Sequence, residues 1–128
     1  YQPNQINRFK IVINNEIDYS YKYADRSQID QLRSKKGICD DIVIVKNDEV
    51  TDCSFANLLF FDGDKWITTE NPLLEGTCRA RLLDQDLISI QKISVNQLQS
   101  FSKMMLINAM LDFDEKRAIQ ISPKTFVF

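Results

Sequence analysis

The stretch of residues 50–83, VTDCSFANLLFFDGDKWITTENPLLEGTCRARLL, places the strictest limits on how this chain can fold. It predicts a strand end that carries the carboxylate of Asp52, followed by a hairpin that turns at Asp62-Gly63. Pro72 breaks the chain, and Gly76-Thr77 predicts a helix start. The first turn of a helix has unpaired N–H groups at the positive end of the dipole, which favours phosphate binding. Capping alone also explains such a start, so both interpretations stay open at this point.

Short strands and helices alternate irregularly on both sides of this stretch. Hairpins take the place of regular βαβ units, and this pattern predicts a single α+β domain. The predicted strand at 41–46 begins at an Asp40-Asp41 pair. We expect this pair to form a solvated turn. Ser27 and Ser94 are predicted helix N-caps, and Gly37 is a predicted helix stop. Strands are predicted at 8–14, 17–25, 41–46, 58–61, 65–68, 87–92, 104–108 and 117–121, and helices at 27–36, 77–85 and from 94 onward.

Histidine is absent from the 128 residues. This excludes Ser-His-Asp and Cys-His nucleophiles, histidine acid–base chemistry and any zinc site that needs histidine, and we expect no metal. The net charge of −2 gives no reason to expect a nucleic acid or an acidic membrane surface as a partner. No apolar run approaches the roughly 18–20 residues that span a bilayer. Three widely spaced cysteines without a C-x-x-C pair favour a reduced, cytoplasmic setting.

Four blocks in order resemble the class IV pyridoxal-phosphate enzymes: KYADRS at 22–27, VTDCSFANLLFF at 50–61, WITTENPLLEGTCRARLL at 66–83 and INAM at 107–110. That family includes branched-chain and D-amino-acid aminotransferases and aminodeoxychorismate lyase. The resemblance implies pyridoxal 5'-phosphate (PLP) as cofactor, a small amino-bearing substrate and a homodimer. It also implies a mixed or antiparallel sheet, partly barrel-like, with flanking helices, as in the larger C-terminal domain of the D-amino-acid aminotransferase fold. Residues 1–128 would then form one cofactor-binding domain, the C-terminal part of a longer two-domain enzyme.

The resemblance also assigns the main catalytic and cofactor-binding residues. Lys22 matches the lysine that forms a Schiff base with the cofactor aldehyde and carries the Cα proton, although spacing alone predicts a solvated lysine. Asp52 lies where the family usually has a glutamate that faces the pyridine nitrogen; the alternative is a simple turn acid. The segment Gly76, Thr77 and Cys78 matches the phosphate turn, with Cys78 as a backbone donor.

Further matches concern the substrate side and the supporting residues. Asn108 and Ala109, with Arg26 four residues after Lys22, match the lyase branch better than the aminotransferases. Asn57 and Arg79 match residues that support the loop. Two positions depart from the family pattern: Thr69 stands where proline is usual, and the segment 111–116 (LDFDEK) lacks the usual Pro-Val.

These matches favour a PLP-dependent enzyme that acts through Lys22. The first expectation is a 4-amino-4-deoxychorismate lyase of folate biosynthesis, which releases pyruvate and leaves 4-aminobenzoate. The second is a class IV amino-acid aminotransferase for branched-chain or D-amino acids. A catalytically incomplete domain with a role in assembly is the third, supported by Asp52 and by the apparent lack of the family's N-terminal domain. An unrelated α+β domain with coincidental similarity is the remaining alternative.

Overall fold

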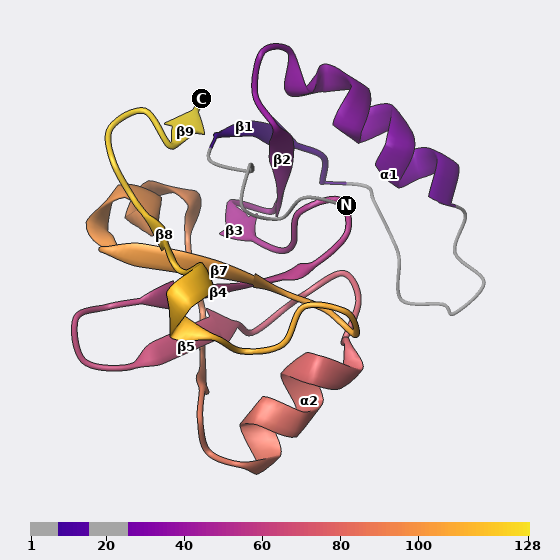
Figure 1. Ribbon diagram of the computed structural model, residues 1–128. Helices are drawn as coiled ribbons and strands as arrows, with labels where there is room; N and C mark the ends of the chain where they lie inside the picture. Colours follow the sequence, from indigo (N-terminus) through magenta and orange to yellow (C-terminus); the bar gives the residue numbers. More distant parts are fainter. Residues whose placement is uncertain (1–7, 16–25) are drawn as a thin grey trace.

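The computed structural model describes residues 8–15 and 26–128, and their strands form two sheets that lie one above the other (Figure 1). The first sheet has the strand order β3-β2-β1-β9. In it β1 runs parallel to both β2 and β9, and β2 runs antiparallel to β3, so the sheet is mixed. Its strands are β1 (Phe9–Ile13), β2 (Asp41–Lys46), β3 (Glu49–Val50) and β9 (Phe126–Val127).

The second sheet has the order β6-β5-β4-β7-β8 and is also mixed. Its centre is the hairpin of β4 and β5, and β4 pairs antiparallel with β7 on its other side. Only the β5–β6 pair in this sheet is parallel. The strands are β4 (Asn57–Phe61), β5 (Trp66–Thr69), β6 (Ser89–Gln91), β7 (Lys103–Ile107) and β8 (Ile119–Gln120).

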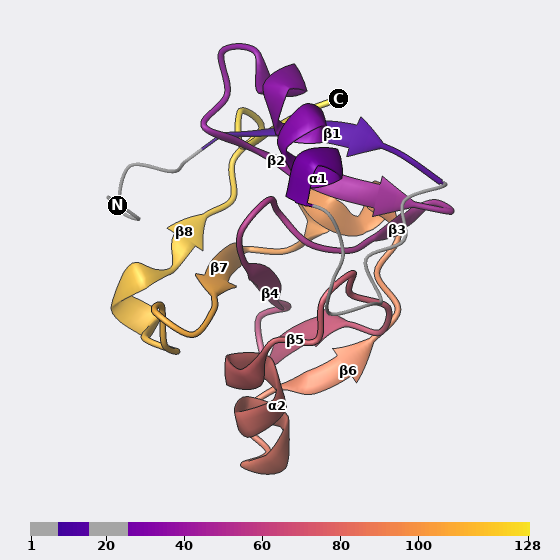
Figure 2. The same ribbon diagram turned by 90° about the vertical axis from the view of Figure 1, so that its right-hand side faces the viewer.

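Two α-helices cover the outer faces of the sheets. Figure 2 shows α1 (Arg26–Arg33) against β1 and β2, and α2 (Thr77–Asp84) beside β5 and β6. Neither helix, nor any other in the described part of the chain, is long and apolar enough to cross a bilayer. The described residues also form short 3-10 helices, which are η2 (Ser34–Lys36), η3 (Val95–Ser100) and η4 (Glu115–Arg117).

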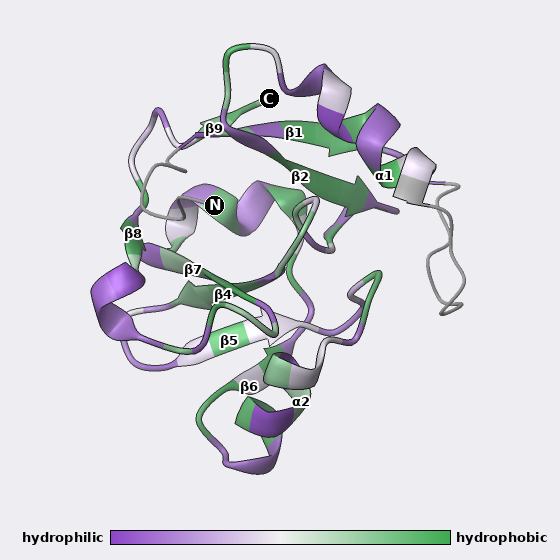
Figure 3. Cartoon of the chain, turned by 45° about the vertical axis from the view of Figure 1, so that its right-hand side comes forward, coloured by the Kyte–Doolittle hydropathy of each residue, from purple (hydrophilic) through white to green (hydrophobic). Residues whose placement is uncertain are grey.

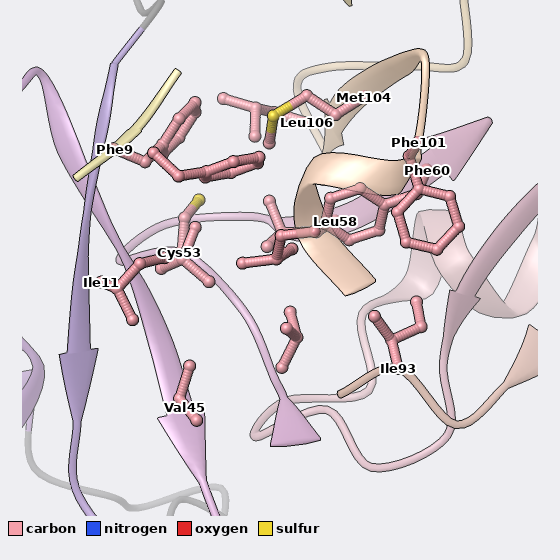
Figure 4. Close-up of a cluster of buried hydrophobic side chains, with 14 of the residues drawn as sticks. Phe9, Ile11, Val45, Cys53, Leu58, Phe60, Ile93, Phe101, Met104 and Leu106 are labelled. Carbon is pink, nitrogen blue, oxygen red and sulfur yellow. The ribbon is translucent and has the colours of Figure 1, made fainter. Parts of the chain in front are cut away.

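Alternation along the central strands explains this layering. Val43 and Val45 of β2 point into the core between the sheets, whereas Ile42 and Ile44 pack against α1. Successive side chains of a strand point to opposite faces, so a strand buried on both faces is a continuous apolar run, as Figure 3 shows for β2 and β4. The core between the sheets joins side chains of both, including Phe9, Ile11, Val45, Leu58, Phe60, Met104 and Leu106 (Figure 4).

The structure confirms the α+β prediction and most of the predicted elements. Gly37 ends η2 with a φ of +59°, and Ser94 with Gln97 forms the capping box of η3, which is a 3-10 helix. The prediction that α1 begins after Ser27 is wrong, because the helix already includes Arg26. The predicted strand at 17–25 lies outside the described residues, and β9 was not predicted.

The prediction of a solvated Asp40-Asp41 turn is wrong for Asp41, which is fully buried. Its carboxylate accepts hydrogen bonds from the Ile42 amide at 2.7 Å and the Ser54 hydroxyl at 2.9 Å, and the Arg33 Nε atom lies 3.6 Å away. Burial raises the pKa of Asp41, and these partners act in the opposite direction. The aspartate therefore joins the start of β2 to the turn before β4, a contact that only the tertiary structure creates.

Candidate functional site

A cavity of about 510 Å³ lies where three loops and α1 meet. The loops are residues 52–57 before and at the start of β4, residues 73–77 up to the start of α2, and residues 108–110 after β7; Ile29 of α1 completes the wall. Each loop belongs to one of the sequence blocks singled out above. Segments far apart in the chain thus meet around one space of a size that suits a small ligand.

The structure brings six of the predicted site residues to this cavity: Asp52, Asn57, Gly76, Thr77, Asn108 and Ala109. Cys78 and Arg79 are buried nearby but do not line it. Arg26 is the first residue of α1, one helical turn before Ile29. Lys22 lies outside the described residues.

Asp52 is buried at the cavity wall, with only 5% of its surface exposed. One carboxylate oxygen, Oδ2, accepts hydrogen bonds from the backbone amides of Leu73 at 2.8 Å and Leu74 at 3.1 Å. The other, Oδ1, accepts from the Asn57 Nδ2 group at 3.0 Å. A carboxylate offers about four acceptor positions, so the bonds from the described residues leave one position on Oδ1 open.

Burial raises the pKa of the Asp52 carboxyl from 3.8 to about 6. The bonds from Asn57, Leu74 and Leu73 and the charge of Arg79 all act to lower this pKa, but they offset only part of the cost of burial. The site thus contains an acid that is mostly ionised at neutral pH and gains a proton in mildly acidic solution.

This raised pKa predicts how stability depends on pH. Because folded Asp52 binds its proton more tightly than the unfolded residue, the free energy of unfolding should fall as pH rises from about 4 to about 6. The expected loss from this group is on the order of 3 kcal/mol. Urea unfolding between pH 4 and 7.5 should show this slope in the wild type, and the slope should be smaller in Asp52→Asn, where the raised pKa of Asp41 still contributes.

Asp62, whose pKa is shifted in the opposite direction, is the control for that experiment. Its exposed carboxylate accepts bonds from the Lys65 and Asp64 amides, which lower its pKa. It contributes stability that is present above its unfolded pKa and is lost as pH falls through its folded pKa. Asp62→Asn should therefore leave the slope between pH 4 and 6 in place. An Asp52→Asn slope equal to that of the wild type would contradict the assigned burial of Asp52.

The start of α2 forms a second polar wall of the cavity. Gly76 is the N-cap, in an extended conformation, and no side chain in the described part of the chain caps the helix. The Gly76 amide donates to Asn57 Oδ1 at 3.2 Å, and the first helical bond runs from the Ala80 amide to the Gly76 carbonyl. Within the described residues, the amides of Thr77 and Cys78 have no acceptor. Free amides at a helix start are the donors that phosphate groups bind in proteins.

Cys78 and Arg79 point away from the cavity. The Cys78 thiol packs in the cluster between α2 and the second sheet, and burial raises its pKa, so it is a poor nucleophile. The Arg79 Nη2 group donates to the Thr69 carbonyl at 3.1 Å, while its Nε has no partner in the described part of the chain. Arg79 thereby connects α2 to the end of β5.

Thr69, which stands where the family usually has proline, is almost fully buried at the end of β5. Its hydroxyl donates to the Val50 carbonyl at 2.7 Å. Thr69→Val keeps the shape but leaves that carbonyl unpaired, so we expect a loss of roughly 1–3 kcal/mol in urea unfolding. The exposed Asn71, which bonds Glu49, is the control, and Asn71→Ala should change stability by less than about 0.5 kcal/mol. Equal midpoints for the two variants would contradict this role of Thr69.

Asn108 uses its side chain to shape the third loop. Its Oδ1 accepts from the Met110 and Leu111 amides at 2.8 and 2.9 Å, and its Nδ2 donates to the Phe55 carbonyl at 3.0 Å. Each polar atom of the Asn108 side chain is therefore already used in shaping the loop. Downstream, Asp112 forms an ion pair with Arg81 of α2, so the unusual segment 111–116 is attached to that helix.

Sequence reasoning missed several residues that line the cavity: Ile29, Ser54, Phe55, Leu73, Leu74 and Met110. All of these residues except Ile29 lie within the family-like blocks, and Ser54 is the polar one among them, two residues after Asp52. The other residues carry no distinctive chemistry, so only the tertiary structure reveals them.

Comparison with known proteins identifies the family. The sequence model described as "Amino-transferase class IV" matches residues 20–113, which is most of the chain. The chain belongs to the class IV aminotransferase family. Members of this family are PLP-dependent enzymes.

Three relatives of this class IV chain illustrate the similarity. An uncharacterized protein of Haemophilus influenzae is 44% identical over 110 residues, which cover 86% of this chain and 58% of the relative. The crystal structure of a protein of Haemophilus somnus 129PT, provisionally named a 4-amino-4-deoxychorismate lyase, has 42% identity and a TM-score of 0.79, covering 84% of this chain and 56% of that one. A hypothetical aminotransferase of Mycobacterium tuberculosis, solved in its PLP-bound form, shares only the fold, with 12% identity, a TM-score of 0.71 and coverage of 98% and 51%. The chain thus spans less than two thirds of the length of each of these relatives.

The residues around the cavity of this class IV chain fit PLP. The PLP phosphate requires several donors. The start of α2 offers the Thr77 amide at the cavity wall and, directly after it in the backbone, the Cys78 amide, although the Cys78 side chain does not line the cavity. The PLP ring nitrogen requires an acid, and Asp52 has one acceptor position left. A Cβ atom at position 76 would lie 2.5 Å from Asn57 Oδ1, so glycine is required for this close approach. The aspartate, although shorter than the usual glutamate, lines the same cavity as the helix start.

Proposed function

We propose that this protein is a PLP-dependent enzyme that acts on an amino-bearing substrate, and specifically a 4-amino-4-deoxychorismate lyase. The observation that carries the proposal is that an acid, Asp52, and an uncapped helix start at Gly76 line one cavity. The 42% identity with the provisionally named lyase of Haemophilus somnus supports the substrate class. The Asn108-Ala109 pair at the third loop supports the lyase branch in the same way.

In this proposal the site residues have separate roles. PLP, when bound, supplies an electron-accepting ring that weakens a bond at the amino-bearing carbon of the substrate. Asp52 would accept a hydrogen bond from the ring nitrogen and balance its positive charge. The amides of Thr77 and Cys78 would donate to the phosphate. Lys22 would hold the cofactor covalently through its amine, with water leaving from the cofactor aldehyde. Once the substrate amine has displaced it, the freed Lys22 amine would accept and return the substrate proton. Asn108 and Ala109 border the substrate side.

Trapping the cofactor tests the enzyme class. The complete protein purified with PLP should be yellow, and after borohydride reduction a phosphopyridoxyl mass should be found on the peptide that contains Lys22. Absence of cofactor and adduct from the complete protein would reject the proposal in favour of a catalytically incomplete domain.

A product assay then separates the lyase from an amino-acid aminotransferase. Lyase activity produces pyruvate and 4-aminobenzoate from 4-amino-4-deoxychorismate in equal amounts without a keto acid. Transamination depends on an added keto acid and consumes it. Turnover that requires a keto acid would replace the lyase proposal with the aminotransferase.

The family resemblance also leads us to propose a cytoplasmic homodimer. Light scattering on the complete protein would test the oligomeric state, and cell fractionation would test the compartment. A monomer with full activity would refute the first statement, and recovery outside the cytoplasm would refute the second.

A further inference from the structure

The side chain of Asn57 lies between the acid of the site and the start of α2. Asn57 is the first residue of β4 and has only 6% of its surface exposed. Its Nδ2 group donates to Asp52 Oδ1 at 3.0 Å and to the Leu74 carbonyl at 2.7 Å, and its Oδ1 accepts from the Gly76 amide at 3.2 Å. One amide group thus contacts the acid, the loop and the helix cap.

These contacts form a closed circuit of hydrogen bonds. The Leu74 amide donates to Asp52 Oδ2, while the Leu74 carbonyl accepts from Asn57, which in turn donates to Asp52 Oδ1. The circuit also determines the orientation of the Asn57 amide. A flipped amide would place Oδ1 against two acceptors and Nδ2 against the Gly76 donor, so only one orientation satisfies every group.

The Asn57 side chain lies so close to Gly76 that there is no space for a side chain at position 76. A Cβ atom at position 76 would approach Asn57 Oδ1 to 2.5 Å, closer than real Cβ contacts come. Both partners are therefore restricted to their present residue types, since Asn57 must donate and accept at once and residue 76 must lack a side chain. An aspartate at position 57 would have the right shape but no donor, and would oppose the charge of Asp52.

We propose that Asn57 is a positioning residue that couples the acid of the site to its anion-binding turn. Its amide holds the Asp52 carboxylate and the Gly76 cap at a fixed separation, so a change of charge at Asp52 reaches Gly76 through one side chain. This deepens the proposed function, on which it rests for the roles of the acid and the turn. The hydrogen-bond circuit itself does not depend on any ligand.

Other titratable groups lie near Asp52, and one of them, Arg79, acts on its pKa. Arg79 of α2 lowers the Asp52 pKa, and Asp41 and Asp52 both act on the intervening Cys53 thiol, whose burial keeps it neutral. Glu75 lies on the cavity wall and is exposed. None of these groups is hydrogen-bonded to both Asp52 and Gly76, so a response shared by those two residues points to Asn57.

NMR of the full chain without cofactor tests the coupling. In the wild type, the Asp52 carboxyl carbon should titrate at about 6, and the Gly76 amide should show a step at the same pH. In Asn57→Leu, loss of a donor to the ionised form should raise the Asp52 pKa above its wild-type value, and the step at Gly76 should disappear. Asn57→Ser, which is too short to reach both partners, should behave in the same way and serves if the leucine variant does not fold.

Thr68→Val is the matched control. Thr68 is fully buried on the neighbouring strand, and its hydroxyl donates to the Leu58 carbonyl at 3.2 Å, away from the cavity. The variant should lose stability but keep both titrations. A wild-type Gly76 amide that does not respond at the Asp52 midpoint, or an unchanged Asp52 pKa in a folded Asn57 variant, would overturn the proposal. Because neither readout needs PLP, failure of cofactor binding would leave this result intact.

Discussion

Lys22→Ala is expected to abolish the borohydride-stable cofactor adduct and to lower kcat by on the order of 1000-fold or more. In the proposed function, this amine is both the covalent attachment point and the group that moves the substrate proton. Alanine can do neither, and free PLP in the cavity would retain only its noncovalent contacts with Asp52 and the start of α2. Mass spectrometry of the reduced protein and steady-state kinetics measure the two losses separately.

Two further variants define the specificity of this result. Lys22→Arg keeps the positive charge, but a guanidinium remains protonated and cannot act as an amine nucleophile, so it should be as inactive as alanine. Lys35, on the exposed surface of η2, is the control, and Lys35→Ala should keep both the adduct and the activity. An adduct on another lysine, or substantial turnover by Lys22→Ala, would show that the resemblance assigned the wrong residue.

Gly76→Ala is expected to weaken PLP binding by roughly 100-fold and to destabilise the protein by about 1–3 kcal/mol. The backbone at Gly76 has φ −69° and ψ 156°, a conformation that alanine adopts readily, so backbone strain is not the cause. The cause is the added Cβ atom, which would lie 2.5 Å from Asn57 Oδ1. Either Asn57 or the helix start must move, and each movement disturbs the phosphate donors.

Gly63→Ala is the matched glycine control for this experiment. Gly63 lies in the β4–β5 turn with a φ of +100°, and a Cβ atom there would meet nothing within 4 Å. Its substitution should cost about 1 kcal/mol or more through backbone strain alone. Fluorescence titration with PLP should show an unchanged affinity for Gly63→Ala. Equal loss of affinity in both variants would mean that Gly76 acts through global stability and not through the cavity.

Local signals in the sequence account for the elements that were predicted well. The apolar run DIVIVK predicted β2 with the observed bounds, because a strand buried on both faces needs apolar residues at every position. Asp62-Gly63 predicted the hairpin, and Ser94 predicted the cap of η3. In each case the signal lies within a few neighbouring residues, so a short window of sequence contains it.

Long-range pairing accounts for the elements that were missed. β9 is two residues long and pairs with β1 from the opposite end of the chain, with Phe9 beside Phe126. Nothing in a two-residue strand distinguishes it from a loop until its partner is known. The prediction for Asp41 was wrong for a similar reason. Its buried carboxylate contacts Ser54 and Arg33, which lie in other parts of the fold.

By itself, the sequence determined the chemistry available to this protein: no histidine, an acid at position 52, a Gly-Thr helix start at 76–77, and four blocks typical of class IV enzymes. Only the tertiary structure decided that the acid is buried with a raised pKa, that Asn57 links it to Gly76, and that these groups line one cavity. The physical reason is that burial and hydrogen-bond partners depend on distances between segments that lie far apart in the chain. Residue types set which bonds can form, and the packing of the two sheets and α2 sets which of them do form.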